Sequence, residues 1–113
     1  MRDKTEAKIQ QEIFTYIKNN FGLAHHNPKW IIMSIPNESQ SREETMRKLS
    51  IGMLPGASDM VLIRPNKITF IEVKTPIGKQ SDNQITFEND VKLLGFDYIL
   101  VRSLDDVKKY LSI

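Results

Sequence analysis

Three side chains that could hold a metal ion and act beside it fall in the middle of the chain. Glu72 and Lys74 are two residues apart in a β-prone segment, so a strand would carry both on one face. Asp59 begins an apolar stretch that ends at Pro65-Asn66, which predicts a hairpin between the two segments. If the turn contains only these two residues, Asp59 lies opposite Glu72, with Cβ atoms roughly 4.5–5.5 Å apart.

Two carboxylates at that separation repel each other unless a cation lies between them. Oxygen ligands suit hard divalent cations, so the pair predicts Mg²⁺ or Mn²⁺. Lys74 would lie beside that ion, where it could orient or deprotonate water or neutralise charge on a phosphate. The set indicates phosphodiester hydrolysis. The alternatives are a solvated Glu-x-Lys pair on an exposed face, or a bulge near Pro65 that shifts the pairing by one residue.

The rest of the chain is predicted to form helices and further strands around this hairpin. Isoleucines recur every four residues from Ile9 to Ile17, and two capping boxes mark later helix starts. The expected elements are a helix over Lys4–Phe21, a strand over Trp30–Ile35, a helix from Ser41 to about Leu49, strands over Asp59–Arg64 and Lys67–Lys74, a helix from Ser81 that carries Phe87, Val91 and Leu94 inward, a strand over Asp97–Val101 and a helix from Ser103. The last crossover favours parallel pairing, so the fold class is α/β, a mixed sheet with an antiparallel hairpin and a parallel strand, flanked by helices.

Composition bounds the class of protein. The 113 residues suit one domain, taken as residues 1–113. Lys and Arg number 16 against 14 Asp and Glu, and the net charge of +2 permits a nucleic-acid partner without indicating one. The absence of cysteine excludes disulfides, thiol nucleophiles and thiolate zinc sites. The first twenty residues contain no apolar run typical of a signal peptide or membrane span, so we expect a soluble, intracellular, cytoplasmic protein.

Three segments, GMLPGASD ending at Asp59, IEVKT around Glu72 and GKQSDNQ ending at Gln84, follow one another in a specific order and spacing. Together they resemble the VRR-NUC family of the PD-(D/E)xK nuclease superfamily. The superfamily's leading Pro-Asp is Ser58-Asp59 here, which leaves the acid in place. The resemblance implies a restriction-endonuclease-like core, metal binding by Asp59, Glu72 and the Val73 backbone carbonyl, a catalytic Lys74 and Gln84 lining the site.

Two further side chains are candidates for the same site. On a helical wheel Glu6 continues the inward stripe of isoleucines, whereas Glu12 faces solvent, so Glu6 is favoured as a first-helix acid and Glu12 stays open. The family similarly places an acid in this helix near the metal. Glu6 could instead reach water at the helix start. Gln84 points close to its helix's buried face, where a polar group needs a partner, although it also completes the capping box with Ser81.

The loops beside the proposed site carry candidate DNA contacts, and basic residues outnumber acidic ones in this part of the chain. The candidates are Arg47, Lys48, Lys79 and Ser58. No base-reading element is recognisable, so recognition of backbone shape is expected. The resemblance implies branched DNA as the partner and a homodimer, with no membrane and no small organic cofactor.

The sequence therefore predicts a Mg²⁺- or Mn²⁺-dependent endodeoxyribonuclease. Its expected substrate is branched DNA, such as four-way junctions or flaps, in replication or repair. One alternative is a catalytically silent module of the same fold that binds DNA or a protein. The other is an endonuclease specific for a duplex sequence, which the lack of an added recognition domain disfavours.

Overall fold

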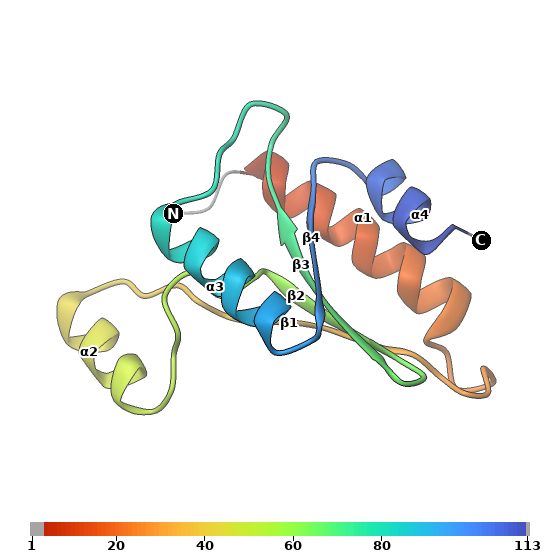
Figure 1. Ribbon diagram of the computed structural model, residues 1–113, viewed down its shortest axis with the longest axis horizontal. Coiled ribbons are helices and arrows are strands. Elements are labelled where there is room, and N and C mark those ends of the chain that lie inside the picture. The colour runs from red at the N-terminus through yellow and green to blue at the C-terminus, as the bar shows by residue number, and fades with distance from the viewer. Residues whose placement is uncertain (1–3, 113) are drawn as a thin grey trace.

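The computed structural model describes residues 4–112 as four helices and four strands in the predicted order (Figure 1). The predicted domain bounds of 1 and 113 lie outside the described residues. The elements are α1 (Lys4–Phe21), β1 (Ile31–Ser34), α2 (Arg42–Ser50), β2 (Met60–Arg64), β3 (Lys67–Val73), α3 (Asp82–Leu93), β4 (Asp97–Val101) and α4 (Leu104–Leu111). One sheet runs in the order β1-β2-β3-β4, and the predicted α/β class is confirmed.

The hairpin between β2 and β3 has the predicted register. The strands are antiparallel, Arg64 faces Lys67 and Met60 faces Ile71, so no bulge intervenes. Asn66 has a φ of 58°, the positive value that a type II turn requires after a proline. Strand β4 pairs with β3 in parallel, as its crossover through α3 predicts.

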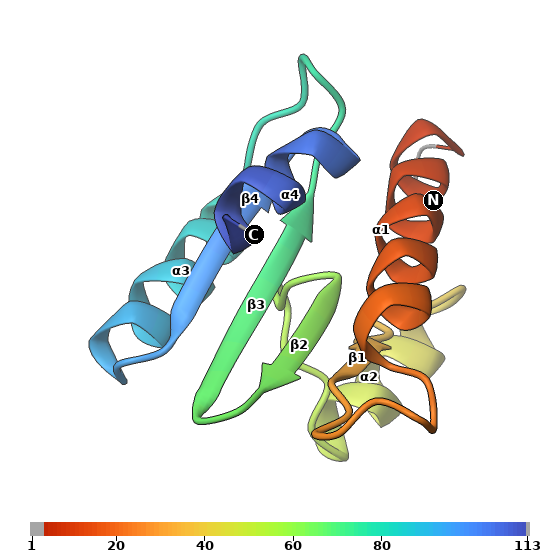
Figure 2. The ribbon, with the colours of Figure 1, turned by 90° about the vertical axis from the view of Figure 1, so that its right-hand side faces the viewer.

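Helices cover both faces of the sheet (Figures 1 and 2). The main core lies under α1 and α4, and its largest members include Ile13, Ile17, Leu62 and Ile71. On the other face Phe87 of α3 packs edge-on against the rings of Phe70 and Tyr98. Glu72, two residues beyond Phe70 on β3, therefore faces α3.

The prediction that Leu94 points inward is wrong, because it is 75% exposed. Helix α3 ends at Leu93, and Leu94 caps it just before the chain reverses through Gly95, whose φ is +92°. Phe87 is half-buried and Val91 is buried, as predicted. The apolar stripe of α3 thus ends one turn earlier than its sequence indicates.

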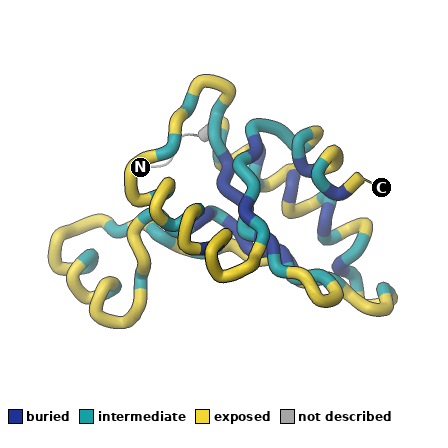
Figure 3. Tube along the Cα trace, viewed as in Figure 1, coloured by how far each residue is buried: buried dark blue, intermediate teal, exposed yellow. Residues whose placement is uncertain are grey.

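Helix α2 stands apart from the body, and none of its residues is buried (Figure 3). It begins at a Ser41 cap, whose side chain accepts from the Glu44 amide, as predicted. Helix α2 and the turn after it expose apolar side chains, which are Met46, Leu49, Ile51 and Leu54. Among residues 4–112 no helix is long and apolar enough to cross a bilayer.

Candidate active site

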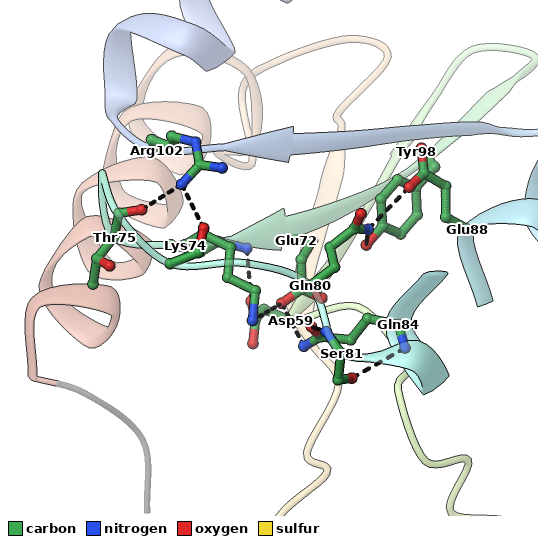
Figure 4. Close-up of polar contacts among 12 residues, drawn as sticks. Asp59, Glu72, Lys74, Thr75, Gln80, Ser81, Gln84, Glu88, Tyr98 and Arg102 are labelled. Carbon is green, nitrogen blue, oxygen red and sulfur yellow. Dashed lines mark hydrogen bonds and ion pairs between the residues drawn. The ribbon is translucent and has the colours of Figure 1, made fainter. Parts of the chain in front are cut away.

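Asp59 and Glu72 meet at the open end of the β2–β3 hairpin (Figure 4). The register that pairs Met60 with Ile71 brings the preceding Asp59 opposite Glu72, as the sequence predicts. One Asp59 oxygen, Oδ2, accepts the backbone N–H of Val73 at 2.7 Å, which fixes the carboxyl at the end of β3. The two carboxyl groups are close enough to share a hydrogen bond.

Glu72 is the unusual group of this site because it is an acid in the protein interior, only 2% exposed. Burial, and then the charge and hydrogen bond of Asp59, raise the pKa of Glu72 from 4.5 to about 8. Its Oε1 atom has no hydrogen-bond partner within the described chain. A buried carboxyl with a vacant oxygen costs free energy unless a cation or donor satisfies it.

Lys74 extends from the end of β3 on the same face as Glu72. Its Nζ lies 3.9 Å from Glu72 Oε2, and its side chain is 13% exposed. The lysine charge lowers the pKa of Glu72, but this effect is smaller than those of burial and Asp59. The Lys74 amide donates to the Val101 carbonyl at 2.9 Å, so the parallel strand β4 holds the backbone that carries this side chain.

Gln84 contacts both its helix cap and the site. Its Oε1 accepts the Ser81 amide at 2.8 Å, which completes the predicted capping box with the Ser81 side chain. Because the side-chain oxygen of Gln84 is held by this bond, its Nε2 can donate to a different group. Nε2 donates to Glu72 Oε2 at 3.1 Å. The cap of α3 therefore orients a donor toward the buried acid.

Gly56 allows the loop before β2 to lie against the first turn of α3. A Cβ atom at Gly56 would come within 2.3 Å of the Asn83 backbone, and its φ of +85° also disfavours other residues. This close approach brings the loop that ends at Asp59 and the helix start that carries Gln84 to one place. The site is thus assembled from β2, β3 and α3.

Glu6 is the first-helix acid that the structure favours over Glu12. Its side chain is half-buried, whereas that of Glu12 is exposed. The charge of Glu6 contributes to the raised pKa of Glu72, so α1 directs negative charge toward the site.

Solved structures of other proteins share this architecture. No family model and no curated protein matches the sequence. Two solved structures match nearly all of it: a "VRR_NUC domain protein" with a TM-score of 0.75 and 15% identity, covering 99% of this chain and 88% of that one, and a "VRR_NUC domain" with a TM-score of 0.64 and 20% identity, covering 96% and 95%. The chain has the VRR-NUC fold. The expectation drawn from its three motifs is confirmed at this level.

The oxygen atoms of this VRR-NUC fold suit a hard cation. Among residues 4–112 no three His, Cys, Asp or Glu side chains converge as a metal cage. Mg²⁺ nevertheless binds commonly through one or two carboxylates, with water and substrate phosphates completing its shell. Glu72 Oε1, which has no hydrogen-bond partner among residues 4–112, is one carboxylate oxygen that such an ion could bind. The Val73 carbonyl points to the same neighbouring strand as its amide, which Asp59 accepts, so it is available to the same ion.

The candidate DNA contacts lie in different surroundings. Ser58 is fully buried and donates to the Met60 carbonyl at 3.1 Å, so the prediction that it contacts DNA is wrong. It secures the start of β2 instead. Lys48 pairs with Glu44 at 2.6 Å within α2. Arg47 and Lys79 are exposed, on α2 and on the loop after β3, and their role stays a prediction.

Sequence reasoning missed Arg102, which secures the loop after Lys74. Its Nη1 donates to the carbonyls of Thr75 and Gly78 at 2.6 and 2.8 Å (Figure 4). Its own amide donates to the Asp106 carboxylate at 2.8 Å. No sequence motif marks this arginine, because its acceptors are backbone carbonyls brought near by the β3–β4 pairing.

A second network borders the site on the α3 side. Gln80 Nε2 donates to Glu88 Oε1 at 2.9 Å and to the Tyr98 hydroxyl at 3.2 Å. Burial, followed by the charge of Glu72, raises the pKa of Tyr98. Gln80 belongs to the GKQSDNQ segment, but the sequence does not indicate that Glu88 and Tyr98 are its partners.

Proposed function

We propose that the protein is a metal-dependent, structure-specific endodeoxyribonuclease that hydrolyses phosphodiester bonds in branched DNA, such as four-way junctions or flaps. The observation that carries this proposal is the buried Glu72, which faces Asp59, lies 3.9 Å from Lys74 and has one oxygen without a hydrogen-bond partner among residues 4–112. A buried acid with a raised pKa, beside a second acid and an amine, is typical of a site that performs chemistry. The VRR-NUC fold supports the same class of activity.

Mg²⁺ or Mn²⁺ is the proposed cofactor, held by Asp59, Glu72 and the Val73 carbonyl, with Glu6 adding negative charge from α1. All of these groups offer oxygen, which such ions prefer. When bound, the ion supplies Lewis-acid polarisation of a phosphate and a lowered pKa for a coordinated water.

The remaining groups of the proposed site act on orientation and charge. Lys74 Nζ carries positive charge at the edge of the buried pair, where it can hold the attacking water or stabilise charge on the phosphate oxygens. Gln84 holds Glu72 in one orientation through its hydrogen bond to Oε2. Arg102 keeps the loop after Lys74 in place.

DNA is the proposed partner, and the proposed place of action is the cytoplasm, in replication or repair. Arg47, Lys48 and Lys79 are proposed to contact phosphates, which gives affinity for backbone shape rather than sequence. Contacts of this kind weaken as salt increases.

A homodimer is proposed because α2 suits pairing with a second copy of itself. Met46 and Leu49 share one face of α2, and the helical period puts Arg47 and Lys48 on the opposite face, where they stay available to DNA. A two-fold axis across the Met46 and Leu49 face would bring two copies of the helix together. The exposed Met46 and Leu49 would then be covered. Two copies would provide two sites for two DNA strands.

The test is cleavage of labelled linear, flap and four-way DNA with Mg²⁺, Mn²⁺ or EDTA. We expect wild-type protein to cut branched DNA only with metal, and Asp59→Asn to bind it without cutting. Asp90→Asn is the matched control, since Asp90 is an exposed acid of α3, and it should cut normally. Equal cutting by Asp59→Asn would contradict the proposal. Binding without cutting under every condition would favour a silent DNA-binding module, and discrete fragments from a plasmid would favour a sequence-specific enzyme.

A further inference from the structure

A recess lies between α1 and the end of β1, directly beside the proposed site. One cavity of about 390 Å³ is lined by Ala7, Gln10, Gln11, Phe14, Ser34 and Met60. A second, of about 270 Å³, shares Gln10 and Ser34 with the first and continues to Asn37, Glu38 and Asp59. Because they share two lining residues, the two cavities are adjacent, and together they are called here the α1 groove, with Phe14 in the lining of the first and Asp59 in that of the second.

The lining of the α1 groove is unlike a phosphate site. Among residues 4–112 no lysine or arginine lines either cavity, and the second is lined by the acids Glu38 and Asp59. Without a bound cation these two acids would repel a phosphate. The polar atoms that remain are amides and a hydroxyl, the groups that hydrogen bond to the edges of bases.

Phe14 adds an aromatic surface at the far end of the groove. It lies two turns along α1 from Glu6, whose charge acts on Glu72, and its side chain is 40% exposed. Nucleobases that are not paired stack on such rings in many proteins that bind single strands. The α1 groove thus offers a stacking surface and side-chain amide groups beside the Asp59–Glu72 pair.

We propose that the α1 groove binds one unpaired nucleobase of the DNA strand that is cut, next to the scissile phosphate. This inference rests on the proposed nuclease function and narrows its substrate. A base inside a duplex is stacked and paired, and entering a recess would require it to leave the stack at a cost of a few kcal/mol. Flaps and gaps offer an unpaired base without that cost. The preferred substrates are therefore flaps and gapped DNA rather than fully paired four-way junctions.

Binding in EDTA tests the inference without cleavage. Fluorescence anisotropy at fixed salt compares the dissociation constants of a flap and a fully paired four-way junction of equal length. Wild-type protein should bind the flap more tightly. Phe14→Ala should weaken flap binding on the order of tenfold and leave junction binding unchanged, since stacking on an aromatic side chain has that size. A 2-aminopurine at the first unpaired nucleotide should change its emission on binding to wild type, and less with Phe14→Ala.

Two further variants keep the test independent of folding. Gln11→Ala removes an exposed amide from the groove and should also weaken flap binding selectively. Leu93→Ala removes an exposed apolar side chain on α3 and should change neither affinity. Equal loss for both DNAs with Phe14→Ala, no loss for either groove variant, or no DNA binding by wild type would overturn the inference.

The same measurements separate this inference from the nuclease proposal. Selective flap binding without cleavage under any metal would retain the groove and reject the nuclease. Metal-dependent cleavage with no selective effect of the groove variants would retain the nuclease and reject the groove.

Discussion

The amide of Gln84 donates to Oε2 of Glu72 at 3.1 Å while its carbonyl oxygen is held by the cap of α3. The start of a helix and the buried acid are therefore joined through one side chain. Gln84 thus has two roles, capping α3 and holding Glu72. A substitution can separate them, because a glutamate at residue 84 would preserve the capping box and remove the donor.

Gln84→Glu should retain the helix and lose activity. The substituted carboxylate can still accept the Ser81 amide but repels Glu72, so we expect cleavage to fall about 10- to 100-fold, as outer partners of metal ligands commonly show. Ser81→Ala is the complementary control. It removes the cap oxygen and should cost about 1 kcal/mol of stability with little loss of activity. Thermal unfolding and cleavage rates measure both, and a fully active Gln84→Glu would contradict the assigned role.

Arg102→Met should slow the proposed reaction without weakening DNA binding. The variant leaves the carbonyls of Thr75 and Gly78 without their donor, so the loop after Lys74 shifts. A misplacement of about 1 Å can cost on the order of 100-fold in rate. We expect kcat to fall with KM for DNA unchanged, and Arg102→Lys to restore part of the rate. An exposed basic residue of α4 provides the control, Lys109→Met. A change confined to KM would argue against a positioning role.

The stability of the metal-free protein should fall as pH rises from about 5 to about 8. In the unfolded chain Glu72 loses its proton near 4.5, whereas in the folded protein burial and Asp59 raise its pKa to about 8. Between these values the folded state binds the extra proton, so raising the pH favours unfolding. Glu72→Gln cannot ionise and should reduce this decline. The melting temperature in EDTA at several pH values measures the effect, and a flat profile for wild type would exclude it.

Mg²⁺ should reverse the same decline. A cation that binds the ionised pair stabilises the folded state and lowers the pKa of Glu72. The melting temperature of wild type at pH 8 should therefore be higher with Mg²⁺ than in EDTA. The same difference should be much smaller for Glu72→Gln.

Met46→Glu should dissociate the proposed dimer. It places a charge in the apolar surface formed by α2 and the turn after it, which includes Leu49 and Ile51. Leu93→Glu introduces the same charge at another exposed apolar residue and should leave the dimer intact. Sedimentation velocity gives the masses. A wild-type monomer at all concentrations, or dissociation by both variants, would remove support for α2 as the interface.

The hairpin and its register could be predicted from the sequence because they depend on local rules. Pro65-Asn66 defines a two-residue turn, and alternation then determines which side chains face each other. The same alternation predicts that Asp59 lies opposite Glu72. The capping box at Ser81 likewise follows from neighbouring residues alone, and so does the Ser41 cap, although Glu44 accepts the Gln40 amide instead of closing the predicted box.

The predictions that failed concern residues at the ends of elements, and the contacts that the sequence did not indicate join distant segments. Leu94 fits the helical period of α3, but the helix has already ended there. Ser58 lies in a loop by its sequence, and only the fold shows that the loop is packed inward at this residue. The contact of Gly56 with Asn83 and the bonds of Arg102 involve backbone atoms, which carry no residue signature.

Mn²⁺ binding shows directly whether Glu72 holds a divalent cation. Electron paramagnetic resonance of free Mn²⁺ during titration gives its affinity for wild type, Glu72→Gln and Glu88→Gln, the last altering a carboxylate of α3 that pairs with Lys92. We expect Glu72→Gln to bind Mn²⁺ at least about tenfold more weakly than wild type and Glu88→Gln to match wild type. Equal Mn²⁺ affinity for wild type and Glu72→Gln would contradict this expectation.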